Sequence, residues 1–208
     1  MKYIKYFILL IVLVLLIFIF YPRKKYSDSD FSIMTYKSSV DKDLDGIDDQ
    51  TDILNNALEY ISKKPKYKSK YYITGYSNDH FGVCTDVVAY ALLNSGYDLM
   101  SLVNEDIKNN KELYNIDKID KNIDFRRVRN LKVYFDRHAI SLSKNINDIY
   151  EWHAGDIVVF ENHIGIVSNI RNKKGIPYVI HHRSKFQRNY IEDILGKRYK
   201  IIGHYKIS

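Results

Sequence analysis

Cysteine is almost absent from this sequence, which has one, Cys84, in 208 residues. No disulfide can form within the chain, and zinc sites built from four cysteines, or from two cysteines and two histidines, are excluded. An unpaired thiol is open to oxidation unless it is buried or used. Cys84 is therefore either a small buried apolar residue or a reactive group, and its neighbours must decide between the two.

A large excess of basic charge is also absent once the charges are located along the chain. The formal net charge is +7, but five of the 32 basic side chains flank one N-terminal apolar stretch: Lys2, Lys5, Arg23, Lys24 and Lys25. The remaining 27 basic side chains are nearly balanced by 25 acidic ones. We therefore expect no nucleic-acid partner. Because 46% of the residues are hydrophobic, the chain can form one domain around one core.

Charged residues are missing between Tyr6 and Pro22, and every residue from Ile8 to Phe20 is apolar. As a helix, this stretch would span roughly 25 Å, close to the thickness of a bilayer core. No small residues mark a cleavage site after it, so we expect an uncleaved signal anchor, a transmembrane helix, over residues 1–25. The flanking charge alone would leave the C-terminus inside the cell. We expect the reverse, a single-pass membrane protein with its domain outside the cytoplasm, because of the family resemblance described below.

The segment after the anchor divides into a polar stretch and an acidic loop. Residues 26–40 show no sustained period, and we expect a linker there. Residues 41–70 combine the loop with a helix expected from Asp52 to Ser62, and residues 71–208 form the main domain. Within the loop, acidic residues occupy positions 1, 3, 5, 9 and 12, and Gly46 stands at position 6: Asp41, Asp43, Asp45, Asp49 and Asp52.

This spacing follows the calcium-binding loop of EF-hands, in which the residue at position 7, here Ile47, offers its backbone carbonyl. The sequence therefore predicts a Ca²⁺ site over residues 41–52. Asp52 replaces the longer glutamate that usually stands at position 12, which suggests weaker or altered binding. An acidic turn that caps the following helix without any metal explains the same residues, and the sequence leaves both interpretations open.

Cys84 stands at the start of a predicted helix that ends near Gly96. Apolar residues recur four positions apart at Val83, Val87 and Ala91, which is typical of a helix with one buried face. In the first turn of such a helix, free backbone amides and the positive end of the dipole surround the sulfur. That position favours the thiolate and lowers the pKa of a cysteine, as a nucleophile requires.

Two histidines lie on neighbouring predicted strands downstream of Cys84. The strands cover residues 155–160, 163–168 and 177–181, and a tight hairpin joins the first two. A five-residue loop from Arg171 to Gly175 would set His181 opposite Gly165, on the same face as His163 and diagonal to it. A shift of one residue would select His182 instead.

The order of these elements resembles the NlpC/p60-like cell-wall peptidases of the papain superfamily. Their pattern has a Tyr-x-x-Gly-Gly element, whose second glycine is Tyr76 here, a cysteine that opens a helix, Gly-Asp before a strand, His-x-Gly-Ile, and a polar residue one strand later. The matching residues are Tyr72, Gly75, Cys84, Gly155, Asp156, His163, Gly165, Ile166 and His181. Residues 71–205 resemble more closely a bacterial family called domain of unknown function 1287 (DUF1287), through the blocks GVCTDVV, NIDFRRVRNL, GDIVVF, HIGIV and GHY.

The resemblance implies an α+β papain-like fold in which the nucleophile helix packs on an antiparallel sheet. It implies Cys84 as nucleophile, His163 as general base and His181 as the residue that orients it. Tyr72 would line the site. Thr85 and Asp86 would contact the substrate, and they depart from the Ser-Gly that follows the peptidases' cysteine.

The implied reaction is cleavage of an amide bond in peptidoglycan stem peptides through a thioester, with no cofactor in the chemistry. Two alternatives remain. One is a calcium-dependent cell-surface binding module that has kept the fold and lost turnover. The other is an acyltransferase that uses the same thiol, since hydrolase and transferase share the acyl-enzyme.

Overall fold

The computed structural model describes residues 2–20, 24–197 and 199–208, with no side-chain description for residues 2 and 14–20. Helix α1 covers Lys2–Phe20. None of the helices in these described ranges is both long enough and apolar enough to cross a membrane, which takes roughly 20 apolar residues. The transmembrane helix expected over residues 1–25 is therefore wrong, and so is the single-pass membrane localisation that depended on it. Residues 1 and 21–23 of that expected anchor lie outside the described residues.

The main domain is α+β, as expected, and its principal sheet is antiparallel. The described strands of this sheet follow the order β4-β9-β5-β6-β7-β8, and β1 pairs with β6 beside this path. The bounds are β1 Tyr26–Ser27, β4 Ile140–Ser141, β5 Ile157–Phe160, β6 His163–Arg171, β7 Pro177–Ile180, β8 Ile191–Glu192 and β9 Ile201–Lys206. A separate parallel pair joins β2, Lys66–Tyr67, to β3, Phe81–Gly82.

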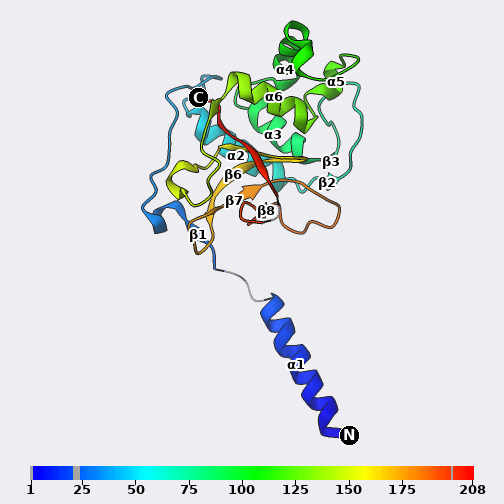
Figure 1. Cartoon of the computed structure of the whole chain (residues 1–208), viewed down its shortest axis with the longest axis vertical. Helices are drawn as coiled ribbons and strands as arrows, with labels where there is room; N and C mark the ends of the chain where they lie inside the picture. The colour runs from blue at the N-terminus through cyan, green and yellow to red at the C-terminus, as the bar shows by residue number, and fades with distance from the viewer. Residues whose placement is uncertain (1, 21–23, 198) are drawn as a thin grey trace.

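Helices α2 to α6 lie on one side of this sheet (Figure 1). The α-helices are α2 Asp49–Ser62, α3 Cys84–Leu93, α4 Leu99–Asn109, α5 Lys121–Asp124 and α6 Val128–His138, and the 3-10 turns are η1 Asp28–Phe31, η2 Lys111–Leu113 and η3 Ile149–Glu151. Ile157 and Val159 of β5 belong to the core that the helices cover. Val158 and Phe160 belong to a second core on the opposite face, with Trp152. Because both faces are covered, β5 is an apolar run and does not alternate with polar residues.

Helix α3 is the element that carries Cys84 into the domain. Val87, Val88, Ala91 and Leu92 are fully buried in the helical core, so one broad face of the helix is covered. Its neighbours are α2 and β6. The helix has little freedom to rotate, because each of these apolar side chains would lose its buried contacts.

Residues 26–40 do not form the free linker that their composition suggests. Tyr26 and Ser27 pair with Arg171 and Ile170 at the far end of β6. Asp28 then forms an ion pair with the fully buried guanidinium of Arg171. A two-residue strand is too short to leave a periodic pattern in the sequence, and for this reason the attachment could not be read there.

Candidate active site

Cys84 and His163, which lie 79 positions apart in the sequence, line one cavity of about 280 Å³. The cavity lies between the start of α3 and the tight hairpin that joins β5 to β6. Its lining residues are Tyr67, Cys84, Phe160, Glu161, Asn162, His163, His182, Arg183, Tyr199 and Lys200. The structure therefore brings together the residues expected to be nucleophile and general base.

The thiol of Cys84 is half-buried at the first residue of α3. Burial raises the pKa of Cys84 to about 11, while the backbone amides of Ile164 and Thr85 act in the opposite direction. The expectation that the start of the helix lowers this pKa is not met, because the cost of desolvating the thiolate exceeds the contribution of the amides. The resting sulfur is a neutral thiol, and it needs a base when it attacks.

His163 is the first residue of a chain of hydrogen-bonded side chains. Its Nε2 lies 2.9 Å from Nδ1 of His181, and Nε2 of His181 lies 3.2 Å from a carboxylate oxygen of Glu192. The hydrogen bond from His181 holds the pKa of Glu192 below its usual range, so this carboxylate is ionised and can only accept.

The ionised carboxylate favours one tautomer of His181. In the tautomer whose Nε2 donates to Glu192, Nδ1 of His181 accepts from Nε2 of His163. Nδ1 of His163 is then left unprotonated and can take a proton. Burial, followed by the charges of His181 and Arg183, lowers the pKa of His163 to about 3, so the ring is neutral at physiological pH.

The strand register explains why His181 and not His182 meets His163. Ile166 pairs with Ile180, so the next residue, His181, stands opposite Gly165, as the alternation predicts. The turn itself differs from the expected one: Arg171 pairs with Pro177, and the register shifts between Val167 and Arg171. This irregularity restores the expected register at the histidines.

His182 lies beside the same cavity without joining the chain. It is 2% exposed, and its ring packs edge-on against Tyr67 and Tyr190. Its Nδ1 is buried and has no hydrogen-bond partner among the described residues. Burial lowers the pKa of His182 to about 4, with the charge of His181 as the second cause. His182 therefore offers a neutral, unpaired ring nitrogen next to the cavity.

The residues expected to contact substrate do not line this cavity. The hydroxyl of Tyr72 donates to Asp79 at 2.8 Å, and Thr85 is buried. The Asp86 carboxylate is fully buried and accepts two hydrogen bonds from Arg126, at 2.8 and 2.9 Å. Asp86 therefore has a partner within the fold, and the buried ion pair helps to fix the start of α3.

Sequence reasoning missed Tyr67 and Glu192. Tyr67 precedes the cysteine by 17 positions, and it reaches the cavity because β2 pairs with β3 directly before α3. Glu192 reaches His181 because β8 pairs with β7, with Val179 opposite Glu192. A carboxylate beside β-branched residues near the histidine strand was the one available signal, and it is a weak one.

The predicted metal ligands lie in the loop before α2 and, for Asp49 and Asp52, in the first turn of that helix. One carboxylate oxygen from each of Asp41, Asp43 and Asp45 lies within 4.8 Å of the others. Asp49 is engaged elsewhere, since its oxygens accept from the amide of Lys42 at 2.8 Å and from a tyrosine hydroxyl.

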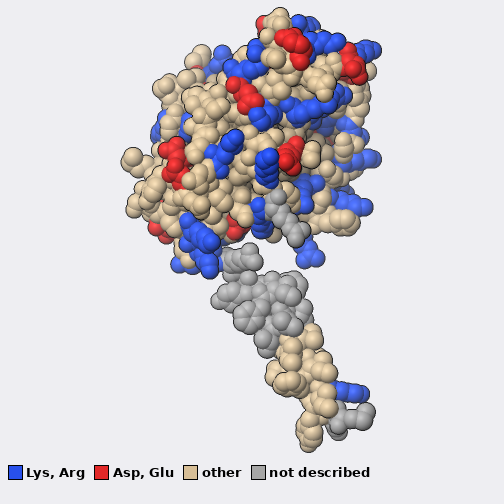
Figure 2. Space-filling view, viewed as in Figure 1, with Lys and Arg blue, Asp and Glu red and all other residues tan. Residues whose placement is uncertain are grey.

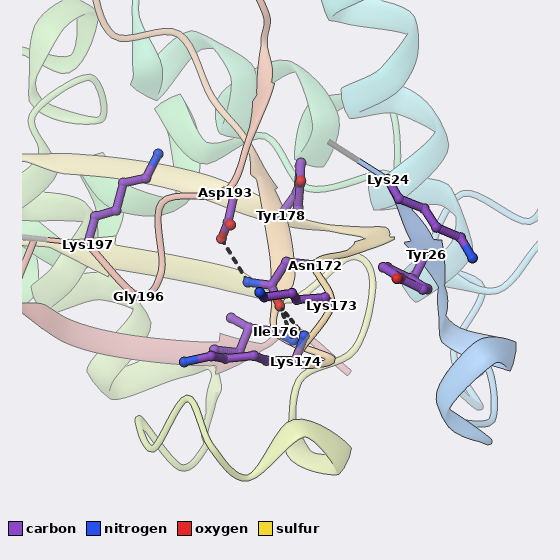
Figure 3. A pocket seen from close by; sticks show the side chains of 10 residues that line it. All are labelled: Lys24, Tyr26, Asn172, Lys173, Lys174, Ile176, Tyr178, Asp193, Gly196 and Lys197. Carbon is purple, nitrogen blue, oxygen red and sulfur yellow. Dashed lines mark hydrogen bonds between the residues drawn. The ribbon is translucent and has the colours of Figure 1, made fainter. Parts of the chain in front are cut away.

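A second and larger cavity, of about 560 Å³, has a different character (Figure 3). Four lysines are among its lining residues: Lys24, Lys173, Lys174 and Lys197. Asn172 donates to Asp193 at 3.1 Å within it. Among the described residues, those that line this cavity include neither a cysteine nor a histidine, whereas Cys84 and His163 line the smaller one.

Comparison with known proteins places the chain in a family. Residues 54–207 match the family model described as "Domain of unknown function (DUF1287)". The chain belongs to this family. It is similar to the "Uncharacterized protein YijF" of Escherichia coli (strain K12), with 37% identity over 153 residues that cover 68% of this chain and 72% of the relative. No solved structure matches the chain. The DUF1287 match includes Cys84, His163, His181 and Glu192 and begins after the acidic loop.

Proposed function

We propose that this DUF1287 protein is a thiol hydrolase of the NlpC/p60-like, papain-type superfamily, which cleaves an amide bond through a thioester. The observation that carries the proposal is the chain from His163 through His181 to Glu192 at the cavity that Cys84 lines. A nucleophile, a base and a group that orients the base are the three parts that acyl transfer requires.

The reaction begins with Cys84 as a neutral thiol and His163 as a neutral imidazole. As the sulfur of Cys84 attacks the carbonyl carbon, Nδ1 of His163 takes the thiol proton, and the C–N bond then breaks as the same proton passes to the leaving amine. Water hydrolyses the thioester by the same path in reverse, which restores the thiol. His181 and Glu192 act as positioning residues, because they hold the His163 ring and stabilise the positive charge that develops on it.

Two groups beside the sulfur suit the stabilisation of a developing oxyanion. The backbone amide of Cys84 lies at the open start of α3, where it has no helical partner. Burial raises the pKa of the Tyr67 phenol above its usual range, and Cys84 adds to this shift, so the hydroxyl stays protonated and able to donate. Both groups are neutral donors.

The charge of the cavity wall favours a substrate that carries a carboxylate near the cleaved bond. Arg183 and Lys200 line the cavity, and the Arg183 guanidinium lies 4.7 Å from the ring centre of Tyr199. The ion pairs within the described part of the chain do not include Arg183, so this planar donor can bind a carboxylate. Peptidoglycan stem peptides offer such carboxylates beside amide bonds, which supports them as the substrate class.

Digestion of purified peptidoglycan, with mass spectrometry of the released fragments, tests the proposal. We expect Cys84→Ala and His163→Ala to reduce fragment release by at least about a hundredfold, while the unfolding temperature stays close to that of the wild type. His80→Ala is the matched control, because His80 is exposed and does not line the cavity.

The products separate this proposal from its rivals. Fragments with a new free carboxylate and a new free amine support the hydrolase. Products in which the acyl group is joined to an added amine would identify an acyltransferase. A wild-type protein that binds stem peptides but releases no fragment, from either intact wall or soluble stem peptides, would contradict the catalytic proposal.

A further inference from the structure

The acidic loop before α2 is folded around its own carboxylates. Asp41 accepts hydrogen bonds from the backbone amides of Asp45, at 3.2 Å, and Gly46, at 2.9 Å. Asp45 accepts from the amide of Ile47 at 2.8 Å. Gly46 has φ +92°, a left-handed conformation that favours glycine. The backbone thus turns sharply at loop position 6 and brings the three aspartates at positions 1, 3 and 5 together.

A fourth carboxylate, that of Asp52 in the first turn of α2, lies near enough to these three for their charges to act on it. Asp52 is only 5% exposed, and its Oδ2 is buried without any hydrogen-bond partner in the described part of the chain. Burial, followed by the charges of Asp45, Asp43 and Asp41, raises the pKa of Asp52 to about 6. A buried carboxylate oxygen without a partner is costly, and the ion pairs of the described residues supply no cation to any of these four.

Helix capping does not account for this cluster. The N-cap of α2 is Asp48, which accepts from the backbone amide of Thr51 at 3.2 Å and from its hydroxyl at 2.7 Å. Asp49 is occupied by Lys42 and Tyr97. The cap is therefore complete without Asp41, Asp43, Asp45 or Asp52, which leaves the buried oxygen of Asp52 unexplained by any role within the fold.

We propose that this loop binds one Ca²⁺ ion through the carboxylates of Asp41, Asp43, Asp45 and Asp52 and the backbone carbonyl of Ile47. Calcium takes six to eight oxygen ligands in flexible arrangements, and waters complete such a set. Four carboxylates give the site a strong negative charge, which selects a divalent cation. The loop precedes residues 54–207, so the site lies outside the part of the chain that matches the DUF1287 family.

The position of the loop indicates what the ion does. It lies directly before α2, whose Gln50 side chain donates to the carbonyl of Ala154 at 2.8 Å and to Asp156 at 2.9 Å. Helix α2 also packs against α3, which carries Cys84. An ion in the loop fixes the start of α2 and through it the turn before β5. The role is stabilisation of the folded domain, and it does not depend on the proposed hydrolase activity.

Calorimetric titration of the EDTA-treated full chain with CaCl2 tests the site. We expect one equivalent to bind, with a Kd between about 10⁻⁶ and 10⁻³ M, and the unfolding temperature to rise by several degrees in saturating calcium. Asp43→Ala should weaken binding at least tenfold. Asp43 is exposed and makes none of the hydrogen bonds that close the loop, so its replacement removes a ligand and leaves the loop geometry intact.

Asp48→Asn is the matched control, because it removes one negative charge from the same loop while asparagine still caps the helix. Its affinity for calcium should stay within about threefold of the wild type. Absence of both heat and a thermal shift with the wild type would overturn the site, and so would unchanged binding in Asp43→Ala. Neither result would bear on Cys84, whose activity is measured separately.

Discussion

At the scale of single residues, the thiol of Cys84 is the feature on which the proposed hydrolysis depends. Its neighbours hold it neutral at rest, since burial raises the pKa of Cys84 to about 11 and lowers that of His163 to about 3. The pair therefore differs from a preformed thiolate and imidazolium. In the proposed reaction, proton transfer therefore has to accompany the attack of the sulfur, in the manner of a serine hydrolase.

This neutral pair predicts the pH dependence of alkylation. Because the thiolate fraction grows tenfold per pH unit well below the pKa, the rate of reaction with iodoacetamide should rise about tenfold per unit between pH 7 and pH 9. Cys84 is the only cysteine in the chain, so mass spectrometry of the modified protein reports on this thiol alone. A rate that reaches a plateau below pH 8 would reveal a preformed thiolate and contradict the neutral pair.

At the scale of secondary-structure elements, the antiparallel contact of β6 and β7 places the two histidines. Gly165 makes this contact possible, because a Cβ atom there would lie 2.5 Å from Val179, 2.7 Å from the carbonyl of Ile180 and 3.2 Å from the Cβ of His181. Backbone atoms cannot give way as a flexible side chain can. The glycine is therefore a packing requirement of the site.

Gly165→Ala should destabilise the fold by about 1–3 kcal/mol through overpacking and should displace His181 from His163. Gly196→Ala is the control, since the nearest atom to a Cβ there is 3.8 Å away, and its effect should stay within about 0.5 kcal/mol. Urea unfolding of both variants measures the difference. Equal stability of the two would show that β6 and β7 can move apart without cost.

Much of this element pattern could be predicted from the sequence, because the signals are local. Apolar runs, turn residues and strand alternation indicated α3, the β5–β6 hairpin and the position of His181. Glu192 could not be predicted, because its strand has two residues and follows a stretch without regular structure. Asp86 was misread as a substrate contact, because its partner Arg126 is 40 positions away and only the fold brings them together. The two-residue strand β1 could not be predicted either, because it is as short as β8.

At the scale of the whole molecule, charge is divided between a mixed surface and a few buried groups. Acidic and basic side chains are interspersed over the face that Figure 2 shows. Inside the fold, burial lowers the pKa of His163 and of His182, which titrate near 6.5 when exposed. These histidines are neutral in the folded chain and take up protons on unfolding in mildly acidic solution.

This difference predicts that acid destabilises the protein. Between about pH 6.5 and pH 4, the unfolded chain binds protons at both histidines that the folded chain does not, so the free energy of unfolding falls as the pH falls. Asp52 has the opposite effect on the free energy of unfolding below pH 6. Its pKa is raised in the folded chain, so the folded chain binds this proton more readily than the unfolded chain does. His182→Phe keeps the ring packing and removes one titrating group, so its unfolding temperature should drop less than that of the wild type between pH 7 and pH 5.

His80→Ala serves as the control for this comparison, since it removes an exposed histidine that folding does not bury. Its unfolding temperature should follow the wild type across the same pH range. If the unfolding temperature of His182→Phe fell with pH as steeply as that of the wild type, protonation of His182 would not oppose folding.

The short pairing of β1 with β6 limits how far the chain can be trimmed. Arg171 is fully buried, where its guanidinium donates to the carbonyls of Ile149, Trp152 and Gly175, and Asp28 supplies its negative partner. A shortened chain that started after Asp28 would leave the Arg171 guanidinium buried in the protein interior without a counter-charge. The minimal folding unit therefore extends well upstream of the family match at residue 54 and has to retain Asp28.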